Sequence, residues 1–266
     1  MSPALLRKLA PLSLFLVPLL TPLLVTSSDA ATIPSAAHGV RFGTSLGSNA
    51  AQTLKIFPKP DIVRIFWSSA KAQLPAMPSS AALWVSFKSL PSQSTFASIL
   101  QSWNRSGRTV YWTYHHEADR DNITATAFRN GWASLLAVEK KYPSTHVKSM
   151  SILTGILLAP NHPHGNPESW YVNADILGFD CYVPASVPRA MAYAKSKLKP
   201  WAIPEFGADN GDLGDIKYIQ STIASWAAYP PLGASWYNNT AGASFSQPLD
   251  KVPRTTTYLQ TLASAS

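Results

Sequence analysis

Residues 176–207 read ILGFDCYVPASVPRAMAYAKSKLKPWAIPEFG. Two apolar runs, Ile176 to Tyr182 and Trp201 to Pro204, have the length and composition of buried β-strands. Between them, Val187 to Leu198 carries a weaker helical pattern. A strand, a helix and a second strand in this order are typical of a parallel sheet covered by helices.

The same alternation extends through the rest of the chain after residue 38. Eight candidate strands can be assigned: Gly39 to Ser45, Asp61 to Phe66, Leu83 to Phe87, Val110 to Tyr114, Ser151 to Leu158, Ile176 to Tyr182, Trp201 to Pro204 and Gly233 to Tyr237. Eight such units in a chain of this length predict the α/β class, as a single closed (β/α)8 TIM barrel. The alternative is an open doubly wound sheet. No Gly-x-Gly-x-x-Gly or Gly-x-x-x-x-Gly-Lys-Ser/Thr motif is present, so nucleotide binding has no support.

The clearest helical pattern lies between residues 122 and 141. Phe128, Trp132, Leu135 and Leu136 fall on one helical face, and Pro143 follows as a stop signal. Similar patterns predict further helices at Phe96 to Trp103, Ile216 to Trp226 and around Tyr258 and Leu262.

The first 30 residues have the order of a secretory signal peptide. Arg7 and Lys8 precede an apolar run from Leu12 to Val25, and small residues follow up to Ala30. We therefore predict a signal peptide over residues 1–30, a catalytic barrel domain over residues 31–266, and a secreted protein. The alternative is a retained anchor, but the apolar run is short for a membrane span and contains prolines.

Composition excludes several other classes. Cys181 is the only cysteine, so no internal disulfide can form, and its apolar surroundings indicate a buried small hydrophobe. Lys and Arg outnumber Asp and Glu by 22 to 14, but the charges are scattered, which favours a solvated surface. We expect a monomer that needs no cofactor, binds no nucleic acid and does not insert stably into a membrane.

Two glutamates follow apolar strands directly. The fourth strand continues into His115-His116-Glu117, and the seventh into Pro204-Glu205-Phe206-Gly207. Function in this barrel gathers at the carboxyl ends of the strands, where a buried carboxylate is costly unless it is paired or functional. Glycosidic bond cleavage requires two such carboxyl groups, one protonated and one ionised. The alternative is a structural ion pair with Arg64 or Arg120.

These motifs resemble glycoside hydrolase clan A. The His116-Glu117 pair is most similar to family 26, the β-mannanase family. The resemblance implies a retaining glycosidase, with Glu117 as general acid/base and Glu205 as nucleophile, acting on a β-linked polysaccharide or oligosaccharide such as β-mannan. It also implies a carboxyl separation of about 5–5.5 Å.

Further positions fit the same resemblance. Tyr182, in Gly178-Phe179-Asp180-Cys181-Tyr182, takes the place of a tyrosine that contacts the nucleophile. Trp236 takes the place of a tryptophan that forms a floor under the sugar. We also predict that Arg64 hydrogen-bonds a carboxylate and that His116 lies in the substrate site.

Two other interpretations remain open from the sequence. His162 and His164 form a His-x-His pair that can ligate zinc, but no third ligand stands nearby, so we predict no metal. The second interpretation is a non-catalytic glycan-binding or cell-surface protein that kept the barrel. Retention of both glutamates favours the enzyme.

Overall fold

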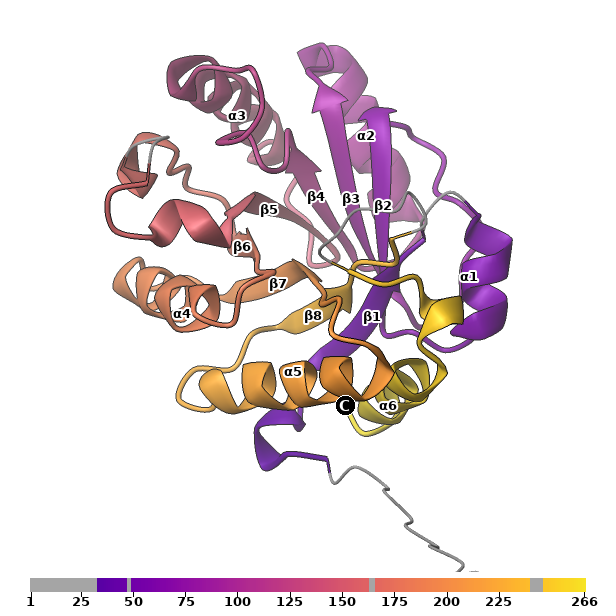
Figure 1. Ribbon diagram of the computed structural model, residues 1–266. Coiled ribbons are helices and arrows are strands. Elements are labelled where there is room, and N and C mark those ends of the chain that lie inside the picture. The colour runs from indigo at the N-terminus through magenta and orange to yellow at the C-terminus, as the bar shows by residue number, and fades with distance from the viewer. Residues whose placement is uncertain (1–32, 47–48, 163–165, 240–245) are drawn as a thin grey trace, which may run out of the picture. The chain divides into compact units, whose positions relative to one another are not determined.

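The computed structural model describes residues 33–46, 49–162, 166–239 and 246–266. Eight parallel strands form a closed barrel in which each strand pairs with the next and β8 returns to β1 (Figure 1). The predicted (β/α)8 barrel is confirmed. The predicted signal peptide, residues 1–30, lies outside the described residues.

The predicted strands all occur, with small differences at their ends. Their bounds are β1 Arg41–Ser45, β2 Ile62–Ser69, β3 Ala82–Ser89, β4 Val110–Tyr114, β5 Val147–Thr154, β6 Ile176–Asp180, β7 Trp201–Phe206 and β8 Gly233–Trp236. The largest difference is in the fifth strand, which starts earlier than predicted and stops at Thr154. Residues Gly155–Leu158, predicted as strand, instead form a 3-10 helix.

Helices surround the barrel (Figure 1). They are α1 Ala50–Ile56, α2 Gln93–Arg105, α3 Ala125–Glu139, α4 Ser186–Ser196, α5 Asp212–Ser225 and α6 Pro253–Ser264. The five helices predicted from periodicity correspond to α2 through α6, whereas the short α1 was not predicted. In the described part of the chain, no α-helix follows β2 or β5, and the connection after β5 contains only short 3-10 turns.

Two apolar layers hold the barrel together. Its interior contains side chains from five strands: Ile62, Trp84, Met150, Ile152, Ile176 and Ala202. Outside β4, the Trp112 ring stacks on Trp132 of α3 with centroids 4.9 Å apart and meets the edge of Phe96 of α2 at the same distance. Such aromatic pairs add about 0.5–1.5 kcal/mol each beyond the area they bury.

Gly43 shows how closely β1 approaches β2. A Cβ atom at this position would lie 2.0 Å from the carbonyl oxygen of Ile62, which is backbone and cannot move aside.

Cys181 is buried, as predicted, and its burial raises the pKa of the thiol to about 12. None of the helices within the described ranges is long and apolar enough to span a membrane.

Candidate active site

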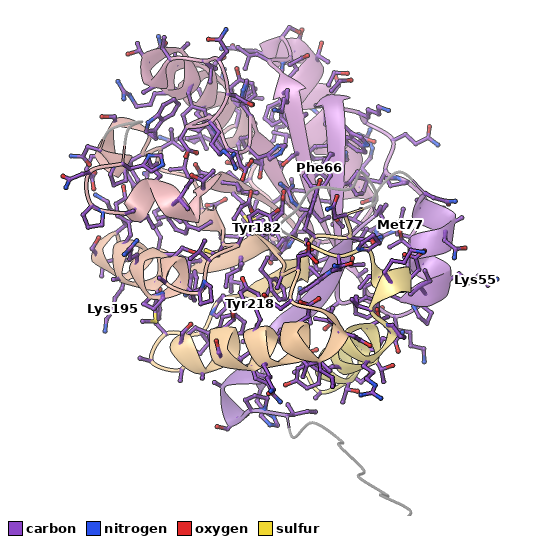
Figure 2. The ribbon with its side chains drawn as sticks, viewed as in Figure 1. Lys55, Phe66, Met77, Tyr182, Lys195 and Tyr218 are labelled. Atoms are coloured by element: carbon purple, nitrogen blue, oxygen red, sulfur yellow. The ribbon has the colours of Figure 1, made fainter. Side chains whose placement is uncertain are left out.

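A cavity of about 160 Å³ opens at the carboxyl ends of the strands. It is lined by Phe66, His116, Glu117, Arg120, Tyr182, Glu205 and Tyr237. Phe66 of β2 and Tyr182, two residues beyond β6, both lie near the centre of the view in Figure 2. The structure therefore brings both predicted glutamates, His116 and Tyr182 into one cavity. It is smaller than the roughly 300–1,000 Å³ of sites for drug-sized ligands.

Glu205 is held on both sides by donors. The Tyr182 hydroxyl donates to its Oε2 at 2.5 Å, and Arg64 lies 3.4 Å from its Oε1. The Arg64 side chain is fully buried, and its second contact is a 2.6 Å hydrogen bond to Ser86. Burial raises the pKa of Glu205, while Arg64 and the Tyr182 hydroxyl act in the opposite direction and favour its ionised form.

An irregularity in β7 turns Glu205 towards the cavity. Ala202 belongs to the barrel interior, and Pro204 lies against Gly178 on the same side, so strict alternation would direct Phe206 inward. The pairing of β7 with β8 shifts between Ile203 and Phe206. Phe206 packs on the Trp236 ring at 5.5 Å instead, and Glu205 lines the cavity. Such bulges commonly re-aim side chains next to active sites.

Glu117 has a different electrostatic environment. Burial, and secondarily the negative charge of Glu205, raise its pKa to about 7, although Arg120 opposes this. Arg64, which pairs with Glu205, acts on Glu117 only as a more distant charge. Burial raises the pKa of both carboxyl groups, but only Glu205 has Arg64 and Tyr182 as donors that favour its anion. Glu117 is therefore better suited to be the acid and Glu205 to carry the charge.

The backbone around Glu117 is strained. His115 and Glu117 both have a φ of 52°, in the left-handed region that side chains with a Cβ rarely adopt. Two contacts fix the segment: the Glu117 N–H donates to the Ile152 carbonyl at 3.0 Å, and Asp119 accepts from the Thr154 N–H at 3.0 Å. The Thr154 hydroxyl donates to the same carboxylate. Strain of about 1–3 kcal/mol per residue persists where surrounding contacts enforce it, commonly at functional sites.

His116 connects the segment after β4 with β2. Its ring lies 5.2 Å from that of Phe66, which also contacts the Tyr237 ring at 6.3 Å and the Arg64 guanidinium, 4.6 Å from the Phe66 centroid. Burial and the nearby cations lower the pKa of His116 well below its ordinary value. A neutral imidazole at this position adds no charge to the cavity.

Trp236 stands elsewhere than the sequence led us to expect. It is fully buried, and its indole N–H donates to the Gln247 carbonyl at 3.0 Å. A side chain with no exposed surface offers no face to a sugar, whereas its neighbour Tyr237 lines the cavity. At this strand end the cavity is thus lined by Tyr237, the residue after β8, and not by Trp236.

Four residues near the site were not predicted as site residues. Phe66 lies two residues beyond Arg64, so strand alternation would have identified it. Asp180 precedes Tyr182 by two residues and is fully buried, with no hydrogen bond to either oxygen in the described structure. Burial, reinforced by Glu205 and Glu117, raises its pKa well above the ordinary range. Arg120 and Tyr237 lie beyond strand ends, where alternation gives no guidance.

No candidate metal centre is found in the part of the chain that the structure covers. Within those residues, no three His, Cys, Asp or Glu side chains are grouped so as to hold a metal ion. His164, the second histidine of the His-x-His pair, lies outside the described residues.

No protein-family model and no curated protein sequence matches this chain. Solved structures do match. A modular endo-β-1,4-mannanase of family 26 from Cellulomonas fimi has a TM-score of 0.54 at 12% identity, over 86% of this chain and 71% of that one. A family 26 β-mannanase from Bacteroides ovatus has a TM-score of 0.57 at 10% identity, over 85% of this chain and 90% of that one. A family 5 broad-specificity endoglucanase from Clostridium longisporum has a TM-score of 0.59 at 10% identity, over 88% of this chain and 99% of that one.

In fold, this chain resembles the clan A glycoside hydrolases. The resemblance predicted from a few strand ends thus extends over most of the barrel. At such low identity the match establishes the architecture, so the chemistry has to be argued from the site itself.

Proposed function

We propose that this protein is a retaining glycoside hydrolase that cleaves a β-linked polysaccharide. The observation that carries the proposal is the presence of Glu117 and Glu205 in one cavity, where burial raises both pKa values but only Glu205 is held by the donors Arg64 and Tyr182. Two carboxyl groups so differentiated are what glycosidic cleavage by double displacement requires. The barrel shared with mannanases makes β-mannan the first polymer to test.

In the first step, ionised Glu205 attacks the anomeric carbon while protonated Glu117 transfers its proton to the departing glycosidic oxygen. Tyr182 and Arg64 hold the attacking carboxylate in place. The result is a glycosyl ester on Glu205 and an ionised Glu117.

In the second step, Glu117 removes a proton from water, which attacks the anomeric carbon and releases Glu205. The pKa of Glu117 supports this change of role. Part of its elevation comes from the negative charge on Glu205, and that charge is absent while Glu205 is esterified. Glu117 is therefore more acidic in the intermediate, when it must act as a base.

The test is hydrolysis by the wild-type chain and by Glu117→Ala and Glu205→Ala. Mannan, xylan, mixed β-glucan and cellulose serve as substrates, and released reducing ends are measured. We expect cleavage of at least one polymer and a loss of at least 1,000-fold in the Glu205 variant. The anomer released first, read by NMR, should have the β configuration. A chain that binds a polymer without cutting it would be a glycan-binding protein instead, and an α product would exclude retention.

We also propose that the protein is exported, with residues 1–30 removed. The sequence order of that segment supports the proposal. Expression in a secreting host, followed by N-terminal sequencing of the protein in the medium, tests it. We expect Ala31 as the first residue, and a protein retained in the cell membrane would contradict removal.

A further inference from the structure

Three cations belong to consecutive parts of the barrel. Arg64 lies on β2, Lys88 on β3, and Arg120 in the loop after β4. Of the three, Arg120 lines the cavity. Two of them already have anionic partners: Arg64 pairs with Glu205 at 3.4 Å, and Lys88 pairs with Asp121 at 2.5 Å.

Arg120 differs from the other two. It is exposed and lines the cavity, and no carboxylate in the described structure lies within ion-pair distance of its guanidinium. Residues 47–48, 163–165 and 240–245 contain no Asp or Glu that could supply one. Asp119 and Asp121 are occupied elsewhere, since Asp119 accepts from Thr154 and Asp121 pairs with Lys88 and His115. Glu117 is close enough for Arg120 to lower its pKa, but the two side chains form no ion pair in the described structure.

When Glu117 is protonated, the charge at the wall of the cavity is positive. Glu205 is compensated by Arg64, and Glu117 is neutral when it is ready to act as an acid. What remains uncompensated at the wall of the cavity is the Arg120 guanidinium. Lys88 can contribute as well, because it is 47% exposed and its surface ion pair with Asp121 contributes about 1 kcal/mol or less.

We propose that Arg120, assisted by Lys88, binds a carboxylate of the substrate, so that the preferred polymer is a β-linked glycan containing uronic acid residues. This inference rests on the proposed hydrolase function and specifies its substrate class. A guanidinium binds a carboxylate through two parallel hydrogen bonds, which gives it both strength and orientation.

A carboxylate is the anion that adds least bulk to a sugar ring. A uronic acid replaces the hydroxymethyl group of a hexose with a carboxylate and adds almost no volume. A sulfate or phosphate ester adds a bulky tetrahedral group to the same ring. The carboxylate is therefore the anion that the proposal names, and a sulfated polymer is the comparison.

Matched polymers test the inference. β-Mannan and cellulose are each compared with the same polymer oxidised at C6 to the uronate, and a sulfated preparation of each is included. The full chain and Arg120→Gln are assayed for kcat/KM. Arg105→Gln is the matched control, because it removes the same charge from an exposed arginine at the far end of α2. The quantity compared between variants is the ratio of kcat/KM on the oxidised polymer to kcat/KM on the neutral one. Loss of Arg120 also changes the pKa of Glu117, but that change affects both polymers alike and leaves the ratio unchanged.

We expect the wild type to prefer the oxidised polymer at least tenfold, and this preference to weaken as salt is added. Arg120→Gln should lower the ratio of oxidised to neutral activity at least tenfold, and Arg105→Gln should leave it unchanged. Three outcomes would overturn the inference. The wild type could cleave the neutral and oxidised polymers equally well, it could prefer the sulfated polymer, or Arg120→Gln could lose the same activity on the neutral and the oxidised polymer.

A binding measurement separates this inference from the proposed function. Titration of the full chain with a uronate oligosaccharide and its neutral counterpart is followed calorimetrically, in wild type and Arg120→Gln. If no polymer is cleaved but the uronate binds through Arg120, the hydrolase proposal fails and the carboxylate site stands. If the neutral polymer is cleaved and the uronate does not bind, the carboxylate site fails alone.

Discussion

The Tyr182 hydroxyl donates a 2.5 Å hydrogen bond to Oε2 of Glu205. This bond crosses from the end of β6 to β7 and fixes the orientation of the carboxylate we assign as nucleophile. It also favours the ionised form of Glu205, because a donor to a carboxylate stabilises the anion. The hydrogen bond thereby opposes the effect of burial, which raises the pKa of Glu205.

Tyr182→Phe removes this donor and keeps the ring. We expect kcat to fall roughly 100-fold, the order found when one donor to a reacting oxygen is lost. The acidic limb of the pH–rate profile should move to higher pH, because the pKa of Glu205 rises. Tyr218→Phe is the matched control: it removes a buried hydroxyl that donates to the Cys181 carbonyl and does not touch Glu205. An unshifted acidic limb in Tyr182→Phe would remove Tyr182 from the mechanism.

The buried ion pair between Arg64 and Glu205 predicts coupled stability effects. Arg64→Met leaves the Glu205 carboxylate buried beside Tyr182 alone, which should lower the free energy of unfolding by about 3–5 kcal/mol at neutral pH. Adding Glu205→Gln should restore most of that loss, because the uncompensated charge disappears. Urea denaturation of the two single variants and the double variant measures the coupling. Additive losses would show that Arg64 acts through packing alone.

The pKa of Glu117, raised to about 7, sets the alkaline limb of activity. The acid must be protonated, so kcat/KM should fall tenfold per pH unit above about pH 7. Glu117→Ala should lose most activity on polymers but retain more on aryl glycosides, whose leaving groups need no proton. On aryl glycosides, the pH–rate profile of Glu117→Ala should lack the alkaline limb. If the alkaline limb persists in Glu117→Ala, a group other than Glu117 causes it.

Much of this site follows from strand periodicity. Arg64 and Phe66 share a face of β2 because side chains alternate, and Glu205 is recognisable as a carboxyl after an apolar run. Trp236 shows a limit of the family resemblance, which alone placed it under the sugar. In the structure Trp236 is fully buried, and the next residue, Tyr237, lines the cavity. The irregularity in the pairing of β7 with β8, which turns Glu205 towards the cavity, likewise cannot be read from residue types.

Arg120 illustrates a second limit. Its position depends on the path of the loop after β4, which turns through two left-handed residues, His115 and Glu117. Neither is a glycine, so no residue type marks the turn. The contacts that enforce it, from Asp119 to Thr154, join segments 35 residues apart. Local sequence therefore predicts the carboxylate at this strand end but not the cation beside it.

Glu139 predicts a pH dependence of stability that is independent of catalysis. It lies at the end of α3 and accepts a 2.8 Å hydrogen bond from the Trp112 indole. Burial raises its pKa to about 7, a rise reinforced by Asp175. The folded chain therefore keeps a proton that the unfolded chain releases near its ordinary pKa of 4.5.

The stability that this proton provides is complete below about pH 4.5 and is lost as the pH rises to about 7. Glu139→Gln has no carboxyl to ionise and still presents an oxygen to Trp112. Relative to wild type, the variant should therefore gain about 1–2 kcal/mol in unfolding free energy between pH 4.5 and pH 8. Urea denaturation at both pH values measures this difference, and Glu168→Gln, at an exposed carboxyl bound to Lys197, is the control. An equal effect of Glu139→Gln at the two pH values would show that Glu139 titrates normally.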